Sequence, residues 1–316
     1  MFVKRKIGKL TGLLFCSAIV LSFYNFQIRQ PRSENTNNTL GLFPARTRIK
    51  SIKLDDSFID TAMSAKYIPL EKLPVSAMRK AILHLTENYK REEDCMTCNK
   101  VQQKLSERTI TVNILDEVGP CNFLIFGLGF DSIMWTALNP GRTVFLEDNK
   151  QWVEKMSKTA PFLEIYTVDY LVRSKDFPQS LERFKKQNSC SPSSSAPGCF
   201  LMLNLPQNLL DISWDVIMVD APNGGGGGDT PSRQMSIFTS AILARRNNEG
   251  AHVLVHDVHR EVERVFSDEF LCAENLVEAL ERSARLFSGS RFALRHYYIP
   301  SSESKEFCRD NRLKSH

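Results

Sequence analysis

The stretch that decides the fold runs from residue 122 to residue 148 and reads NFLIFGLGFDSIMWTALNPGRTVFLED. It begins with a short apolar run at 123–126, which predicts a buried strand. A glycine turn at 127–129 and a helical segment at 132–138 follow, and a second apolar run at 143–146 ends in two acids. Strand, turn, helix and strand in this order predict a βαβ unit with parallel strands.

The same alternation continues toward the C-terminus. Further strands are predicted at 164–168, 214–219, 252–255 and 292–299. Helical periodicity predicts helices that flank these strands, at 75–89, 98–106, 149–157, 176–187, 235–246 and 267–287. The Ser/Pro-rich segment 188–198 indicates an exposed loop. The sequence therefore predicts an α/β fold with a mostly parallel sheet.

Positive charge is concentrated at the N-terminus. The formal net charge is +5, and residues 1–33 hold six basic residues and no acid, so the rest of the chain is close to neutral. Binding to a nucleic-acid backbone requires a clustered basic face. A nearly neutral body gives no such face, and we expect no nucleic-acid partner.

Residues 10–28 carry no charge and are long enough, at about 1.5 Å of helical rise per residue, to span a hydrocarbon core of ~30 Å. The basic cluster before them should stay cytosolic, which predicts a single-pass type II protein. A cleaved signal peptide is the alternative, but no small-residue cleavage site follows the apolar run. The expected organisation is a cytosolic tail, a transmembrane anchor, a stem and linker, a lumenal domain and a short tail, at 1–9, 10–28, 29–74, 75–310 and 311–316.

Eight cysteines fit a lumenal, oxidising compartment. Cys16 lies in the anchor, which leaves an odd number, so at least one is free or pairs with another chain. Cys190 and Cys199 bracket the Ser/Pro-rich segment, and a disulfide between them would close it. Cys95 and Cys98 form a CxxC pair, for which a structural disulfide role is favoured over half of a zinc site. A single glycosylation sequon begins at Asn37.

Ligands of open α/β sheets bind beyond the carboxyl ends of the strands. Gly127, Gly129 and Asp131 belong to a turn that we expect to bind the cofactor. The two glycines would let the backbone approach a ligand closely, although a tight turn alone also requires glycine. The absence of a third glycine weighs against a dinucleotide pyrophosphate. Glu147 lies twenty residues after Gly127, a separation at which a carboxylate accepts the ribose hydroxyls of an adenosine cofactor. Asp169, after the third strand, either reaches the adenine edge or is a solvated acid.

Asp220 ends the fourth predicted strand, and His256 and Asp257 end the fifth. Because the carboxyl ends of parallel neighbours meet at one edge, these three side chains are expected in one pocket. Two mechanisms compete. Either His256 or Asp220 removes a proton from an acceptor hydroxyl, or Asp220 and Asp257 hold a divalent cation that lowers the pKa of the hydroxyl. The sequence favours neither.

Five consecutive glycines, 224–228, follow the fourth strand. They form either a mobile lid over the substrate or a surface linker, and their position favours the lid. Shortly after them, Arg233 either clamps a carboxylate-bearing sugar with two hydrogen bonds or is an ordinary surface arginine.

Four blocks of sequence, in order, carry a resemblance. They are CNFLIFGLG at 121–129, GRTVFLE at 141–147 preceded by Asn139, WDVIMVDAP at 214–222, and VHDVHREVE at 255–263 continuing to Phe270-Leu271-Cys272. Over about residues 75–310 the chain resembles the plant polysaccharide-biosynthesis family that includes the glucuronoxylan 4-O-methyltransferases and the irregular-xylem proteins.

The resemblance implies a class I methyltransferase-like Rossmann sheet, for which we expect helices on both faces. The transmembrane helix expected at 10–28 would precede it. It also implies a Golgi-membrane enzyme that uses S-adenosylmethionine to methylate O4 of glucuronic acid side chains on xylan or a related cell-wall polysaccharide. Gly127, Gly129, Glu147 and Asp220 would line the cofactor side.

Two positions depart from the family pattern. Phe130 stands where enzymatic members tend to have histidine, and the glycine run with Arg233 replaces a shorter acidic loop that ends in arginine. Both positions lie where the substrate should bind. The alternative function is therefore a non-catalytic Golgi protein that supports xylan deposition.

Overall fold

The structure is a computed structural model that describes residues 78–80, 82–83, 102–192, 198–224, 227–280, 293–302, 304 and 306–309. The chain divides into two compact units, Met1–Met78 and Arg79–His316, and the elements described below belong to the second. Among the described residues no helix has the length and apolarity to cross a membrane. The expected anchor, the stem, the sequon and the CxxC pair lie outside the described residues, and the domain boundaries stay predictions.

One seven-stranded sheet organises the second unit. Its strands are β1 (Phe123–Phe126), β2 (Thr143–Glu147), β3 (Glu164–Thr167), β4 (Val216–Val219), β5 (Ala251–His256), β6 (Leu276–Leu280) and β7 (Leu294–Ile299). They lie in the order β3-β2-β1-β4-β5-β7-β6. The first five are parallel, and β7 is antiparallel to both of its neighbours. This mixed sheet is the expected Rossmann-like methyltransferase architecture, and its strand order reverses between β1 and β4.

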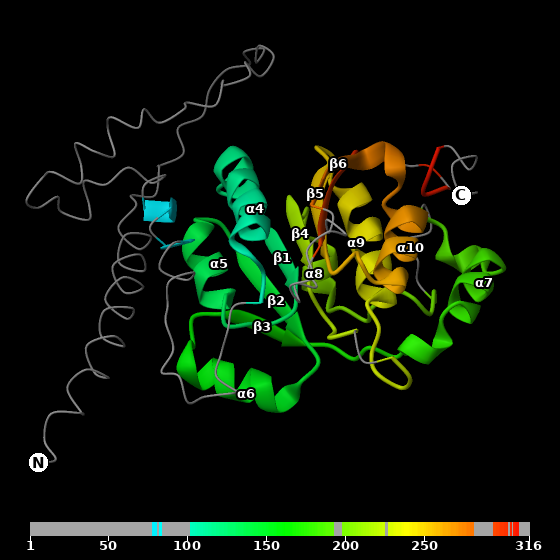
Figure 1. The fold of residues 1–316 in the computed structure, drawn as a ribbon, viewed down its shortest axis with the longest axis horizontal. Helices are drawn as coiled ribbons and strands as arrows, with labels where there is room; N and C mark the ends of the chain where they lie inside the picture. The colour runs from blue at the N-terminus through cyan, green and yellow to red at the C-terminus, as the bar shows by residue number, and fades with distance from the viewer. Residues whose placement is uncertain are drawn as a thin grey trace, which may run out of the picture. The chain divides into compact units, whose positions relative to one another are not determined.

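Helices cover both faces of the sheet. In chain order they are α4 (Leu105–Val118), α5 (Ser132–Leu138), α6 (Lys150–Thr159), α7 (Gln179–Lys185), α8 (Gln207–Leu210), α9 (Gln234–Arg246) and α10 (Glu261–Phe270). Short 3-10 helices are η2 (Ser174–Asp176), η3 (Asn188–Cys190) and η5 (Ala273–Asn275). Figure 1 shows α4, α5 and α6 on one side of the sheet and α7, α9 and α10 on the other.

The alternation of side chains along the strands builds two cores. In β1, Phe123 and Ile125 pack with residues of α4, α5 and α6, whereas Leu124 and Phe126 pack with residues of α9 and α10. All four are buried, as expected for a central parallel strand that is covered on both faces. The continuous apolar runs of the sequence are explained by this double burial.

The predicted strands and the helices predicted at 132–138, 149–157, 176–187 and 235–246 are confirmed to within a few residues, and the predictions of two other helices were wrong. The helix predicted at 75–89 lies largely outside the described residues. The helix expected at 98–106 is α4, which begins at Leu105 and ends at Val118. The helix expected at 267–287 ends at Phe270, because Cys272 adopts a left-handed backbone with φ of 73° and the chain then enters β6. Pairing with β7 overrides the helical periodicity of this segment.

Two disulfides close loops of different length in the described part of the chain. Cys190–Cys199, the predicted pair, joins residues nine apart, and Cys272–Cys308 joins residues 36 apart. Cys121 is buried and free, in agreement with the odd cysteine count. The second disulfide ties the C-terminal segment to the end of α10.

The two disulfides should differ in their contribution to stability. In the chain-entropy account, a cross-link over 36 residues contributes about 4 kcal/mol and one over nine residues about 2.5 kcal/mol. We therefore expect Cys272→Ser/Cys308→Ser to lower the free energy of unfolding more than Cys190→Ser/Cys199→Ser does. Guanidinium denaturation of the two double variants measures this difference, and the reverse order would contradict it.

Candidate functional site

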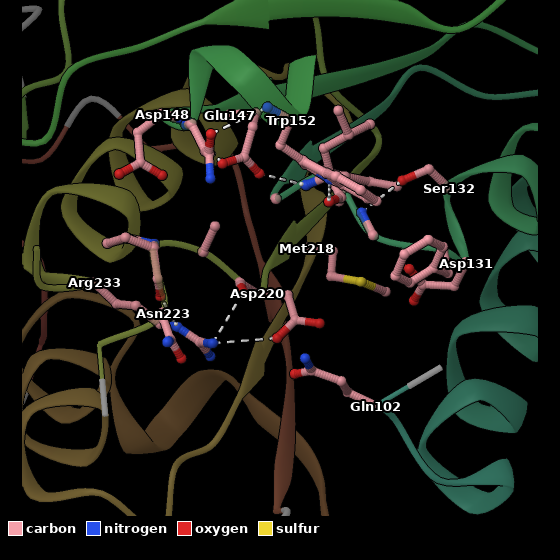
Figure 2. A pocket seen from close by; sticks show the side chains of 18 of the residues that line it. Gln102, Asp131, Ser132, Glu147, Asp148, Trp152, Met218, Asp220, Asn223 and Arg233 are labelled. Carbon is pink, nitrogen blue, oxygen red and sulfur yellow. Dashed lines mark hydrogen bonds and ion pairs between the residues drawn. The ribbon is translucent and has the colours of Figure 1, made fainter. Parts of the chain in front are cut away.

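A cavity of about 510 Å³ lies at the carboxyl ends of β1, β2 and β4, where the strand order reverses. The glycine turn after β1, the end of β2, the segment after β4 and Gln102, just before α4, line it. Figure 2 shows Glu147, Asp148 and Trp152 along one side of the view and Asp220, Arg233 and Gln102 along the other. Of the predicted site residues, Gly127, Gly129, Asp131, Glu147 and Asp220 line this cavity, whereas His256 and Asp257, which were expected in the same pocket, are buried behind it and do not.

The turn after β1 requires glycine at 127 and leaves little room for a side chain at 129. Gly127 has a φ of 124°, and a Cβ there would press on Ala221, while a Cβ on Gly129 would collide with the carboxylate of Asp131. The backbone amides of the turn donate hydrogen bonds to side chains of the protein. The amide of Leu128 donates to the Glu147 carboxylate at 3.1 Å, and the amide of Gly129 donates to the Ser132 hydroxyl at 3.0 Å. These two amides are therefore engaged within the protein and cannot cradle a phosphate.

Glu147 is fixed at the floor of the cavity by backbone amides. Its Oε2 accepts from Leu128, and its Oε1 accepts from Asp148 at 3.1 Å and from Asn149 at 2.9 Å. A carboxylate has about four acceptor positions, so one position on Oε2 remains for a ligand hydroxyl. Burial, together with the nearby charge of Asp148, raises the pKa of Glu147 to about 7. Glu147 can thus accept one ribose hydroxyl rather than both.

Residues that the sequence analysis missed share this side of the cavity. Asp148 lines it next to Glu147 and is placed to accept a second hydroxyl. Trp152 donates from Nε1 to the carbonyl of Leu128 at 2.5 Å and packs edge-on against Phe130, with ring centroids 4.9 Å apart. Phe130 lines the cavity and is 37% exposed, so its predicted place beside a ligand is retained.

Asp169 does not join the site. It is exposed and is not among the residues that line the cavity. Of the two interpretations of this residue, the solvated strand-end acid agrees with its position.

Asp131 reaches the cavity from the start of α5. Its Oδ2 accepts a hydrogen bond from Trp135 Nε1 at 3.1 Å. Burial, with the charge of Asp220, raises the pKa of Asp131 to about 6. Asp131 and Asp220 therefore lie in one cavity with their pKa values moved in opposite directions.

Asp220 faces the cavity, and positively charged groups stand behind it. His256 Nδ1 lies 2.8 Å and Arg233 3.3 Å from its Oδ1, and Gln103 donates to its Oδ2 at 3.0 Å. Burial by itself would raise the pKa of Asp220, but the charge and hydrogen bond of His256, with the charge of Arg233, hold it well below its usual range. The Asp220 side chain remains 23% exposed, so it is an ionised acceptor that a ligand can reach.

His256 does not fit the predicted role of a general base. It is 1% exposed and does not line the cavity. Burial would lower its pKa, but Asp220, with Glu107 and Asp257, raises it to about 10. The ring is therefore an imidazolium at neutral pH and has no nitrogen ready to take a proton.

Arg233 is not available as the predicted sugar clamp. It is buried, and its guanidinium donates to the backbone carbonyls of Pro222, His256 and Asp220 at 2.8–2.9 Å. It also pairs with Asp257 at 3.0 Å. The bidentate fork is used inside the protein, so Arg233 holds the strand ends together instead of gripping a substrate carboxylate.

The predicted divalent-cation site does not fit its surroundings. Asp220, His256 and Asp257 bring ligand atoms within 4.8 Å of one another. However, Arg233 stands between the two carboxylates, and Arg260 pairs with Asp257 at 2.9 Å. A cation bound by Asp220 and Asp257 would have to displace charges that already neutralise them.

The described ends of the glycine run are held against η2. Lys175 donates from its amide to the carbonyl of Gly228 at 2.7 Å, and its side chain pairs with Asp229 at 2.6 Å. Ser174 donates from its amide to the carbonyl of Thr230 at 2.9 Å. Gly225 and Gly226 lie outside the described residues, and the lid stays a prediction.

The charge of the cavity distinguishes between cofactors. Four acids line it, namely Asp131, Glu147, Asp148 and Asp220, whereas Arg233, the one lining cation among the described residues, is neutralised by Asp220 and Asp257. An anionic cavity favours the sulfonium and ammonium of S-adenosylmethionine and disfavours a pyrophosphate. The residues present therefore fit S-adenosylmethionine, with Glu147 and Asp148 placed to accept its ribose hydroxyls.

Comparison with known proteins agrees with this geometry. Residues 82–286 match the model of the IRX15/IRX15L/GXM family. The chain belongs to this family. Its relatives in Arabidopsis thaliana include arabinogalactan O-methyltransferase 2, 41% identical over 64% of this chain and 68% of the relative. Protein IRX15-LIKE is 40% identical, over 62% and 61%, and glucuronoxylan 4-O-methyltransferase 2 is 40% identical, over 63% and 67%. The chain thus spans about two-thirds of the length of these relatives.

The raised pKa of Glu147 predicts that cofactor binding depends on pH. A ribose hydroxyl would donate to the ionised carboxylate, which is depleted as the pH falls through about 7. We expect the Kd of S-adenosylhomocysteine to tighten as the pH rises from 6 to 8. Glu147→Gln should weaken binding by about tenfold or more, the loss of one charged hydrogen bond, and should flatten the pH dependence. Calorimetry across this range measures both, and an equal slope in wild type and variant would refute the assignment.

Proposed function

We propose that the chain is an S-adenosylmethionine-dependent O-methyltransferase that methylates a hydroxyl of glucuronic acid in a cell-wall polysaccharide, xylan or arabinogalactan. The observation that carries the proposal is the single cavity in which Glu147 and Asp220 face one another across the switch point of the sheet. Family membership supports the acceptor class, since relatives are named for both polysaccharides.

The proposed chemistry divides the work between the two sides of the cavity. Bound S-adenosylmethionine supplies a methyl group activated by a positive sulfur. Glu147 and Asp148 hold the ribose, and the glycine turn lets the ligand lie against the backbone. Asp220 would accept the hydrogen bond of the acceptor hydroxyl and take its proton as the carbon–oxygen bond forms and the methyl carbon–sulfur bond breaks, with the electron pair of the broken bond left on the sulfur of the S-adenosylhomocysteine product. A strongly ionised carboxylate suffices, because the proton becomes acidic once the oxygen shares its electrons with carbon.

A supporting role in xylan deposition without catalysis is the second candidate. The observation that favours it is Phe130, which occupies the cavity wall at a position where enzymatic members tend to have histidine. Protein IRX15-LIKE, whose name states no enzymatic activity, is 40% identical to the chain, close to the 41% of arabinogalactan O-methyltransferase 2. Overall identity therefore does not separate the candidates, and a direct assay is needed.

The assay supplies the full-length protein with methyl-labelled S-adenosylmethionine and separate fractions of glucuronoxylan, arabinogalactan and pectin. We expect label in xylan or arabinogalactan. Asp220→Asn should lower kcat by about 100- to 10,000-fold, since it removes the proton acceptor but keeps the shape. Its Kd for S-adenosylhomocysteine should stay near the wild-type value. Binding of the cofactor without label in any fraction would favour the non-catalytic role.

We also propose that the protein is a single-pass type II protein of the Golgi membrane, with residues 10–28 as its anchor. The uncharged run and the basic residues before it support this topology. The disulfides Cys190–Cys199 and Cys272–Cys308 support a lumenal location, since such bonds persist in oxidising compartments.

The topology has a direct test at Asn37, which belongs to the sequon next to the proposed anchor. If the C-terminal side is lumenal, Asn37 should carry a glycan that a glycosidase removes, and Asn37→Gln should migrate like the deglycosylated protein. The C-terminal part should also resist protease in sealed microsomes. Digestion of that part without detergent would contradict the type II orientation.

A further inference from the structure

The N-terminal turn of α4 leads directly from the cavity into a buried polar cluster. Gln102 lines the cavity, while Gln103 and Glu107, one and five residues later, are buried. Neither Gln103 nor Glu107 shows a signal in the sequence, and neither lines the cavity. Both nevertheless lie next to groups that determine the state of Asp220.

Both oxygens of Asp220 are held by side chains behind the cavity. Oδ1 is bound by His256 and Arg233, and Oδ2 accepts from Gln103 Nε2 at 3.0 Å. Gln103 Nε2 also lies 3.3 Å from the sulfur of Met218, another residue of the cavity wall. With Oδ1 doubly engaged, the remaining acceptor position of Oδ2 is the one that an incoming hydroxyl can use.

Glu107 fixes the other end of His256. Its Oε2 accepts from the amide of Lys104 at 2.7 Å, which holds the side chain in place, and lies 3.5 Å from His256 Nε2. The imidazole therefore stands between two carboxylates, Glu107 on Nε2 and Asp220 on Nδ1. His256 contacts both carboxylates in a largely buried environment, where charges interact strongly and an unpaired charge is costly.

We propose that Glu107, acting through His256, and Gln103 are positioning residues that fix the Asp220 carboxylate for the acceptor hydroxyl. Neither residue touches substrate. Glu107 keeps the imidazole of His256 oriented and charged. The imidazole in turn donates a short hydrogen bond to Asp220 and fixes that carboxylate. Gln103 fixes the rotation of the carboxylate through the second oxygen. This inference rests on the proposed methyl transfer, since it assigns these residues to the same reaction.

A purely structural role makes a different prediction. If the cluster only joins α4 to the sheet, its variants should change stability and leave turnover intact in the folded fraction. A positioning role should change kcat while cofactor binding and KM for the polysaccharide stay nearly constant, because the ground-state contacts of the ligands are preserved. Loss of outer contacts of this kind typically lowers activity by about 10- to 100-fold.

The test uses the full-length protein with labelled S-adenosylmethionine and the polysaccharide that the wild type methylates. Glu107→Gln should lower kcat by about 10- to 100-fold and leave the Kd of S-adenosylhomocysteine within about twofold. Glu117→Gln, at the exposed far end of the same helix, is the matched control and should behave as wild type. Gln103→Met, which keeps the length of the side chain without its amide, should show the same split between kcat and Kd.

A double-mutant cycle then tests whether Glu107 acts through His256. In a His256→Asn background, adding Glu107→Gln should cause less than about a twofold further loss, because the connection is already broken. Wild-type kcat in Glu107→Gln and Gln103→Met, or fully additive losses in the cycle, would overturn the proposal. If wild type itself labels no polysaccharide, the proposed function fails instead, so labelling by the wild type distinguishes the two outcomes.

Discussion

The contact between Asp220 Oδ1 and His256 Nδ1, at 2.8 Å, joins the chemistry of the cavity to the buried interior. A carboxylate at the end of β4 would tend to take up a proton on burial, yet this one is ionised because an imidazolium and a guanidinium stand behind it. The same two cations are held by further acids, Glu107 and Asp257. The charge at the cavity wall is therefore a property of a network that reaches from α4 to β5.

This network explains why the pKa of Asp220 differs from the pKa values of the other acids in the cavity. On the opposite side of the cavity, Glu147 is bound by backbone amides and forms no ion pair among the described residues, and burial raises its pKa to about 7. Burial also raises the pKa of Asp131. One cavity thus contains an acid whose pKa is lowered, Asp220, and two acids whose pKa values are raised, Asp131 and Glu147. Such opposite shifts are a feature of sites in which carboxylates have different roles.

Much of the fold was predictable because it depends on local pattern. The apolar runs of β1, β2 and β4 are buried on both faces, so they stand out as continuous hydrophobic segments, and the glycine turn marks the connection to α5. The end of α10 was not predictable, since it depends on the pairing of β6 with β7 and on a left-handed residue, Cys272. Periodicity reports the preference of a segment and not the partner that it meets.

Site residues were predictable from the sequence only where they directly follow a predicted strand. Glu147 and Asp220 follow strands and were identified by position, whereas Gln103 and Glu107 precede or begin a helix whose β-branched residues obscured it. Arg233 and His256 were found, but their roles depend on burial and on neighbours distant in sequence, which no spacing encodes. Calorimetry of the full-length protein with S-adenosylhomocysteine and with NAD tests the central claim most directly. The anionic cavity predicts that S-adenosylhomocysteine binds and NAD does not, and binding of NAD, or of neither ligand, would contradict it.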